Sequence, residues 1–164
     1  MSELPKQVLF SPLNVTEYHR CYDYIEPLRK DETAVLTVET DWEIEKGIQW
    51  PTVMRSKVDG KFKMWYQSGF KVKPEHGEII IDNATQGAWR KVVCYAESDD
   101  GVNWVRPELN LFLTDSFPGN NIVLDWEGFL LDSPSVIEDM EDPDDSRRYK
   151  MLVYHLDRSD PSVT

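Results

Sequence analysis

The sequence contains little cysteine: Cys21 and Cys94 offer neither a zinc-binding spacing nor a disulfide framework. Cys94 lies in an apolar run, where we expect a buried and inert thiol. No apolar run approaches the roughly 20 residues that a membrane helix needs. The N-terminus also lacks the apolar stretch of a secretory signal. These absences predict a soluble, cytoplasmic protein with no membrane partner.

Positive charge is also scarce, since 18 Lys and Arg residues stand against 30 Asp and Glu, which gives a net charge of −12. Such a surface repels polyanions, so nucleic acid is not an expected partner. Neutral carbohydrates stay compatible, because hydrogen bonds and aromatic contacts bind them. The alternative is that the acidic surface serves solubility alone.

Motifs for cofactors and metals are missing as well. The sequence has no phosphate-binding glycine loop and no nucleophile elbow, so we expect no organic cofactor. The three His residues show no ligand spacing. The acidic stretch 138–145 lacks the glycine and the terminal glutamate of a calcium-binding EF-hand loop. We therefore expect no metal and interpret this stretch as a solvated hairpin turn.

What the sequence does contain is short β-type segments separated by tight turns. The β-branched run 33–40 is a plausible strand, while residues 1–32 are polar, with one helix-compatible stretch at 16–25. Asp-Gly pairs at Asp59-Gly60 and Asp100-Gly101 predict tight turns. With the period-two alternation of the flanking residues, they predict antiparallel strands at 51–56, 61–67, 90–97 and 148–155.

A weak internal repeat joins these segments. The run Pro51-Thr-Val leads to Phe62-Lys-Met-Trp-Tyr, and Pro134-Ser-Val leads to Tyr149-Lys-Met-Leu-Val-Tyr. The two Pro lie 83 residues apart, while Phe62 and Tyr149 lie 87 apart, so the second copy has a longer turn. Repeats of this length indicate a sheet that stacks on copies of itself, as the blades of a β-propeller do. Since a propeller needs about four blades, we expect further blades as partners.

The order of these motifs resembles five-bladed β-propeller proteins related to glycoside hydrolase families 32 and 43. The resemblance rests on Trp50-Pro-Thr-Val, on Tyr95-Ala-Glu-Ser-Asp-Asp-Gly-Val-Asn-Trp and on Arg148-Tyr-Lys-Met. It implies an all-β fold of which this chain holds only the first blade and part of the second. The expected divisions are an N-terminal extension with a possible closing strand at 1–40, the first blade at 41–112, and a linker with half of the second blade at 113–164.

The resemblance also implies hydrolysis of O-glycosidic bonds by carboxylates, supplied by the innermost strands of different blades. In family 43 an Asp commonly precedes the Pro of such a strand, but here Trp50 precedes Pro51. Asp132 stands two residues before Pro134 and follows an apolar run, so we expect weak solvation that suits acid/base chemistry. The alternative is that Asp132 caps a turn. Glu43, in the loop before the first innermost strand, is the second catalytic candidate.

Tryptophans supply the candidate substrate contacts. Trp42 and Trp50 are expected to offer ring faces to a sugar, although a Trp beside a strand more often packs in a core. Trp65 and Trp104 are assigned to packing, with Trp104 beneath the turn at Asp100-Gly101. The sequence thus predicts a glycan-processing enzyme fragment, inactive alone. The alternative function is that of a carbohydrate-binding or scaffold propeller without catalysis.

Overall fold

The computed structural model describes residues 33–71, 81–82, 87–126 and 129–157. All of them belong to Thr33–Thr164, the second of two compact units into which the chain divides. The fold of this part is all-β, and its one helical element is a single 3₁₀ turn, η3 (Asp145–Arg147). No helix in the described residues is long and apolar enough to cross a membrane. The stretch 16–25 and Cys21 lie outside the described residues.

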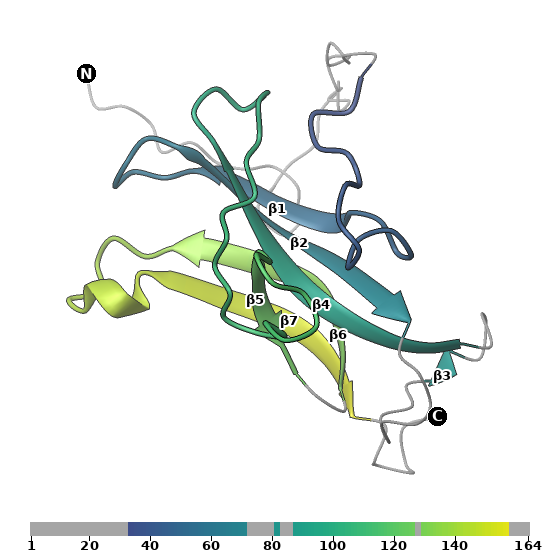
Figure 1. The fold of residues 1–164 in the computed structure, drawn as a ribbon. Helices are drawn as coiled ribbons and strands as arrows, with labels where there is room; N and C mark the ends of the chain where they lie inside the picture. The colour runs from purple at the N-terminus through teal and green to yellow at the C-terminus, as the bar shows by residue number, and fades with distance from the viewer. Residues whose placement is uncertain (1–32, 72–80, 83–86, 127–128, 158–164) are drawn as a thin grey trace, which may run out of the picture. The chain divides into compact units, whose positions relative to one another are not determined.

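The first sheet is an antiparallel meander in which four strands are hydrogen-bonded neighbours in chain order (Figure 1). They are β1 (Gln49–Arg55), β2 (Phe62–Lys71), β4 (Gly87–Ser98) and β5 (Ile122–Asp125). A two-residue strand, β3 (Ile81–Asp82), pairs with the beginning of β4. The strands expected at 51–56, 61–67 and 90–97 are confirmed.

The second sheet is a hairpin of β6 (Phe129–Glu138) and β7 (Tyr149–Asp157), and it confirms the strand expected at 148–155. The acidic stretch forms its turn, where Lys150 pairs with Asp139 and Asp142. The boundary expected at residue 112 precedes β5, which still belongs to the first sheet.

Residues 33–40 are not a strand, which corrects the expectation from their β-branched composition. They form bends and irregular backbone, and no neighbouring strand pairs with them. A β-branched segment becomes a strand only where a partner strand takes its backbone hydrogen bonds.

The turn at Asp100-Gly101 is held by its own side chains. Asp100 Oδ1 accepts hydrogen bonds from the backbone N–H groups of Val102 and Asn103, at 2.8 and 2.7 Å. These bonds lower the pKa of Asp100 well below its usual range. The indole of Trp104 donates to the Gly101 carbonyl and packs against the core, so the motif is structural as expected.

The internal repeat is visible in the strand register. Gln49 pairs with Gln67 and Thr52 with Trp65, which leaves one extra residue in β1. In the second hairpin Asp132 pairs with Tyr154 and Ser135 with Leu152, with the same extra residue in β6. Each of the five pairs between β1 and β2 recurs between β6 and β7, with the β1 residue shifted by 83 and the β2 residue by 87. The two hairpins are therefore copies of one structural unit.

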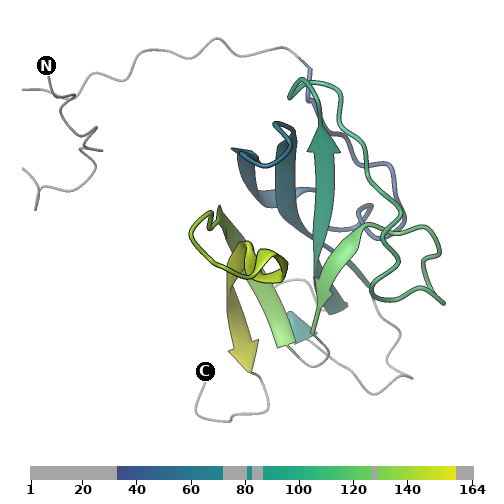
Figure 2. The same cartoon turned by 90° about the vertical axis from the view of Figure 1, so that its left-hand side faces the viewer.

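The second hairpin covers one face of the first sheet (Figure 2). Trp65 and Val93 of the first sheet are buried against Val136 of β6, with Met151 and Val153 of β7 beside them. Polar contacts fix the arrangement, since Thr52 Oγ1 donates to the Pro134 carbonyl at 2.7 Å. This packing is the interface between the two repeats.

The opposite face of the first sheet is covered by irregular backbone rather than by a helix. Tyr66 and Cys94 lie in this second core, together with Trp42, and segments 36–48 and 104–117 pack over it. Burial raises the pKa of the Cys94 thiol well above its usual value, as expected for an inert cysteine. Both faces of the first sheet are therefore covered along β2 and β4, whereas Val53 on the edge strand β1 is still 49% exposed.

Gly69 provides a test of how closely the central strands approach. A Cβ atom at Gly69 would lie 2.6 Å from the Arg90 carbonyl oxygen, inside van der Waals contact. We expect Gly69→Ala to lower the free energy of unfolding by an amount near the upper end of the ~1–3 kcal/mol that overpacking costs. Gly60→Ala is the control, since Gly60 has a φ of 74° but open space around it. Its cost should be about 1 kcal/mol. Urea denaturation that ranks the two variants the other way would contradict this account.

Candidate functional site

The candidate site lies where the two repeats bulge. The extra residue in each bulge is forced into a left-handed conformation: φ is 48° at Trp50 and 50° at Ser133. Both residues precede a proline, and neither is a glycine, so each conformation carries strain. Bulges gather next to active sites because they redirect side chains out of the strand. We call this region the paired-bulge site, comprising Gln49, Trp50, Asp132 and Ser133 with the side chains that hold them.

A buried amide connects the two bulges. Gln67 on β2 is fully buried; its Oε1 accepts the Ser133 N–H at 3.2 Å, and its Nε2 donates to Gln49 Oε1 at 3.4 Å. One side chain therefore contacts both repeats at their bulges. Since both ends of the amide are used, Gln67 fixes the spacing between the two backbones.

One of the two carboxylate oxygens of Asp132 is already engaged in an ion pair. Its Oδ2 accepts a hydrogen bond from Lys91 Nζ at 2.8 Å, and both side chains are partly buried. Its Oδ1 has a long contact of 3.4 Å with the exposed Ser133 hydroxyl. Because carboxylate oxygens accept more than one bond, Oδ1 retains capacity for a ligand hydroxyl.

Trp50 is the aromatic member of the site. Its side chain is 62% exposed, although its neighbours in the strand are part of the sheet. The bulge accounts for this exposure, because the added residue breaks the alternation that would direct the side chain inward. An exposed indole on a rigid backbone offers a flat apolar surface on which the ring of a ligand can pack.

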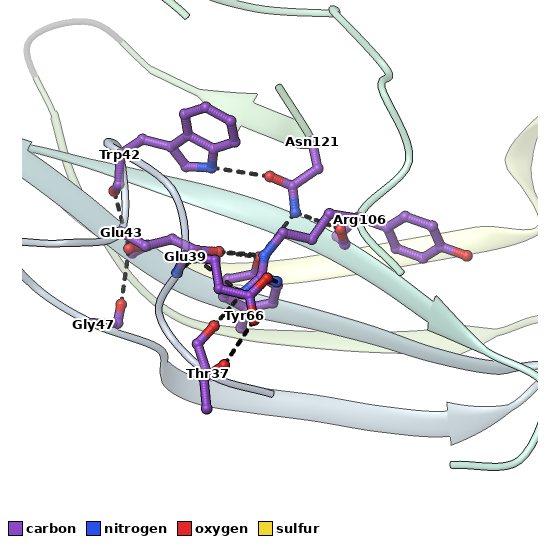
Figure 3. A network of polar contacts seen from close by, with 10 residues as sticks. Thr37, Glu39, Trp42, Glu43, Gly47, Tyr66, Arg106 and Asn121 are labelled. Atoms are coloured by element: carbon purple, nitrogen blue, oxygen red, sulfur yellow. Dashed lines mark hydrogen bonds and ion pairs between the residues drawn. The ribbon is translucent and has the colours of Figure 1, made fainter. Parts of the chain in front are cut away.

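Glu43, the other predicted catalytic carboxylate, is 0% exposed and fully bonded (Figure 3). It accepts the Tyr66 hydroxyl at 2.5 Å, and Arg106 donates to both of its oxygens, at 2.9 and 3.0 Å. Burial raises the pKa of Tyr66, which keeps the hydroxyl protonated as a donor. In this arrangement Glu43 has no oxygen facing solvent.

The sheet separates the two predicted catalytic carboxylates. Tyr66 and Gln67 are neighbours on β2, so their side chains lie on opposite faces. Glu43 bonds to Tyr66 on one face, whereas the backbone next to Asp132 bonds to Gln67 on the other. A glycosidase needs two carboxylates about 5–10 Å apart around one bond. The structure does not bring Asp132 and Glu43 together around a common ligand.

Trp42, the second predicted sugar contact, belongs to the buried network. Its indole N–H donates to Asn121 Oδ1 at 2.9 Å (Figure 3). Its ring also lies against Phe117, with centroids 5.6 Å apart. Asn121 in turn donates to the Tyr66 hydroxyl at 2.8 Å. Trp42 therefore has no ring face open to solvent, and of the two predicted aromatic contacts only Trp50 lies at the surface.

A cavity of about 340 Å³ lies at the other end of the hairpins, between their turns. Lys63 and Arg148 line it, together with Tyr149. Each cation is paired with a carboxylate of the same wall, Lys63 with Asp59 at 2.8 Å and Arg148 with Asp145. The charges of this cavity are thus already compensated. Among the described residues, no group of three metal-ligating side chains is close enough to hold an ion.

Three residues of these networks were not found from the sequence: Gln67, Lys91 and Arg106. Gln67 and Lys91 occur in strands whose apolar neighbours dominate the pattern, and their partners lie 66 and 41 residues further along the chain. Trp50 and Asp132 were named from the sequence, and the repeat offset, which aligns Gln49 with Asp132, is the signal that could have extended the site to Gln67.

The buried ion pair predicts a structural role for Glu43. Glu43→Gln keeps the shape but leaves the Arg106 guanidinium without its carboxylate, so the free energy of unfolding should fall by about 3–5 kcal/mol. Glu39→Gln is the matched control, because that carboxylate also contacts Arg106, at 3.4 Å, but is largely exposed. It should change stability little. Urea denaturation at neutral pH measures both, and equal losses would argue against the assignment.

Comparison of the chain with protein-family models, with curated proteins and with solved structures finds no match.

Proposed function

We propose that the chain binds carbohydrate at the paired-bulge site, as part of a β-propeller of the glycoside-hydrolase-like type. The observation that carries the proposal is the combination of an exposed, rigidly held indole at Trp50 with the partly open carboxylate of Asp132. Both are presented by neighbouring bulges. Sugars are recognised by such pairs, since a ring face packs on the indole and hydroxyls bond to a carboxylate.

Neighbouring repeats supply the geometry of this site. The Thr52–Pro134 hydrogen bond and the Gln67 bridge hold the two bulges side by side, so a ligand on Trp50 lies near the strand that carries Asp132. Lys91 keeps the Asp132 carboxylate in one orientation through a single contact. A preorganised pair of this kind loses little side-chain entropy when a ligand binds.

The charge of the chain favours neutral sugars over anionic ones. With a net charge of −12, the surface disfavours phosphate- or sulfate-bearing ligands at long range. Lys91 is neutralised by Asp132 and adds no free positive charge to the site.

Glycoside hydrolysis is the second candidate function, and the open Oδ1 atom of Asp132 favours it. A carboxylate that contacts the ligand is one half of the catalytic pair. Since Glu43 lies on the other face of the sheet, the second carboxylate would come from another blade. On this reading the chain contributes one catalytic residue and the aromatic platform.

Removal of the indole tests sugar binding directly. Trp50→Gly suits the left-handed backbone, so it should leave the melting temperature almost unchanged. We expect it to weaken binding of a neutral oligosaccharide, identified from a panel of five- and six-membered-ring sugars, by about tenfold, or ~1.4 kcal/mol. Trp126→Ala, at another exposed tryptophan, is the control. Isothermal titration that gives equal affinities for Trp50→Gly and wild type, or no binding to any sugar in the panel, would refute the proposal.

Substitution of Asp132 distinguishes sugar binding from glycoside hydrolysis. In a polypeptide that contains this chain and cleaves aryl glycosides, Asp132→Asn should lower kcat by about 100-fold if the carboxylate transfers a proton. Glu43→Gln should reduce the yield of folded protein but leave the activity per folded molecule intact. Asp144→Asn, in the exposed turn, is the inert control. Full specific activity in Asp132→Asn would exclude catalysis by this residue and leave only binding.

A further inference from the structure

Strand β7 has an open edge in the part of the chain that the structure describes. It pairs with β6 on one side, and no described strand pairs with its other side (Figure 2). The strand is nine residues long and contains no proline. An edge of this kind presents a row of backbone N–H and C=O groups to which another strand can bond. Leu152 and Tyr154 lie along it and are 75% and 61% exposed.

The first repeat shows what pairs with this edge. By the repeat offset of 87 residues, β7 corresponds to β2, just as β6 corresponds to β1. The edge of β2 that faces away from β1 pairs antiparallel with β4 along the whole length of β2. Among the described residues, β7 has no counterpart of β4 beside it. The open edge therefore matches an antiparallel strand of the β4 kind.

The register of the first repeat specifies which side chains meet across this edge. Trp65 pairs with Tyr95 in the first sheet, and their ring centroids lie 5.3 Å apart. Leu152 takes the place of Trp65 in the second repeat, so an added strand of the same kind places its tyrosine opposite Leu152. In the same register Tyr154 lies opposite the counterpart of Val93. Cross-strand apolar pairs of this kind stabilise a sheet.

Charge favours the same register. Lys63 pairs with Glu97 across β2 and β4, and the second repeat keeps the cation at Lys150. An acid at the position of Glu97 therefore lies opposite Lys150, where opposite charges attract. Lys150 already contacts Asp139 and Asp142 at the turn, so this further contact sets the register and supplies little of the affinity.

We propose that the open edge of β7 binds an extended segment of the β4 kind as an added antiparallel strand. The segment carries apolar residues on both of its faces and an acid opposite Lys150. Backbone hydrogen bonds supply the affinity, and the apolar cross-strand pairs supply the selectivity. The proposal uses none of the side chains assigned to carbohydrate, so it stands or falls separately from the proposed function.

Binding of a labelled peptide to the full chain tests the proposal. The probe is a fluorescent synthetic peptide of residues 87–98, with Cys94→Ala to remove the thiol. Fluorescence anisotropy should show saturable binding. Because like charges directly opposite each other repel, Glu97→Lys in the peptide should weaken binding by about threefold.

A peptide with Val92→Pro and Val93→Pro is the matched control. Adjacent residues of a strand direct their N–H groups to opposite sides, so one of the two prolines always removes a bond to β7. This peptide should not bind at concentrations that saturate the first. In the chain, Leu152→Lys should weaken binding of the first peptide by about fivefold. Leu111→Lys, at a residue 62% exposed on a loop, should bind it as wild type does.

Amide hydrogen exchange, measured residue by residue, locates the bound peptide. Its addition should slow exchange at alternate residues of 149–154, because every second N–H group faces the open edge. The amides of β1, the edge strand of the first sheet, should keep their rates. Circular dichroism establishes that each variant of the chain is folded before its affinity is measured.

Four results would overturn the proposal. The first is an absence of saturable binding, and the second is equal binding of the proline peptide. The third is protection at β1, or loss of protection in β2, which would mean that the peptide pairs elsewhere or displaces a native strand. The fourth is a dimer whose β7 amides are already protected, because the edge would then belong to a second copy.

Discussion

Both faces of the first β-sheet must be kept from water, and the rest of the described structure follows from how this is done. One face is covered by irregular segments that the buried Glu43–Arg106 ion pair holds down. The other is covered by the next copy of the hairpin, through Trp65 and Val136. Covering the sheet with irregular segments requires charged groups, because a loop has no regular pattern of backbone hydrogen bonds to satisfy its polar atoms. Covering it with the second hairpin requires only another copy of the same unit.

This constraint accounts for the buried position of Glu43, which we expected to be a catalytic carboxylate. Glu43 beside Trp42 has the composition of a sugar site, but its surroundings depend on Arg106, 63 residues away, and on Tyr66 in a neighbouring strand. Burial of a carboxylate is tolerable only with such partners. No local pattern reveals them. The contacts of Glu43 are those of a buried structural network.

The hairpins, by contrast, were predictable because their signals are local. Asp59-Gly60 and alternating residues such as those of Phe62–Gln67 fix a turn and two strands within about fifteen residues. The strand predicted at 33–40 was wrong for the complementary reason. The composition of this run suits a strand, but a strand forms only where a partner strand pairs with it. The bulges were missed as well, since a bulge is a property of two strands in register. The repeat offset was visible in the sequence and predicted stacked copies of one unit, but the bulge in each copy emerged only from the pairing of Gln49 and Asp132 with their partners.

Comparison of the two repeats separates what the fold requires from what a function can use. The positive φ angle recurs at Trp50 and Ser133, so this strain belongs to the bulge and not to either side chain. Selection for the backbone alone would favour glycine at both positions, because glycine adopts this conformation without strain. The bulky, exposed indole at the first position is therefore not explained by the backbone conformation, whereas Asp132 at the second bulge also pairs with Lys91. At these equivalent places the fold supplies the same backbone geometry, and the side chains that differ there include those that we propose contact a ligand.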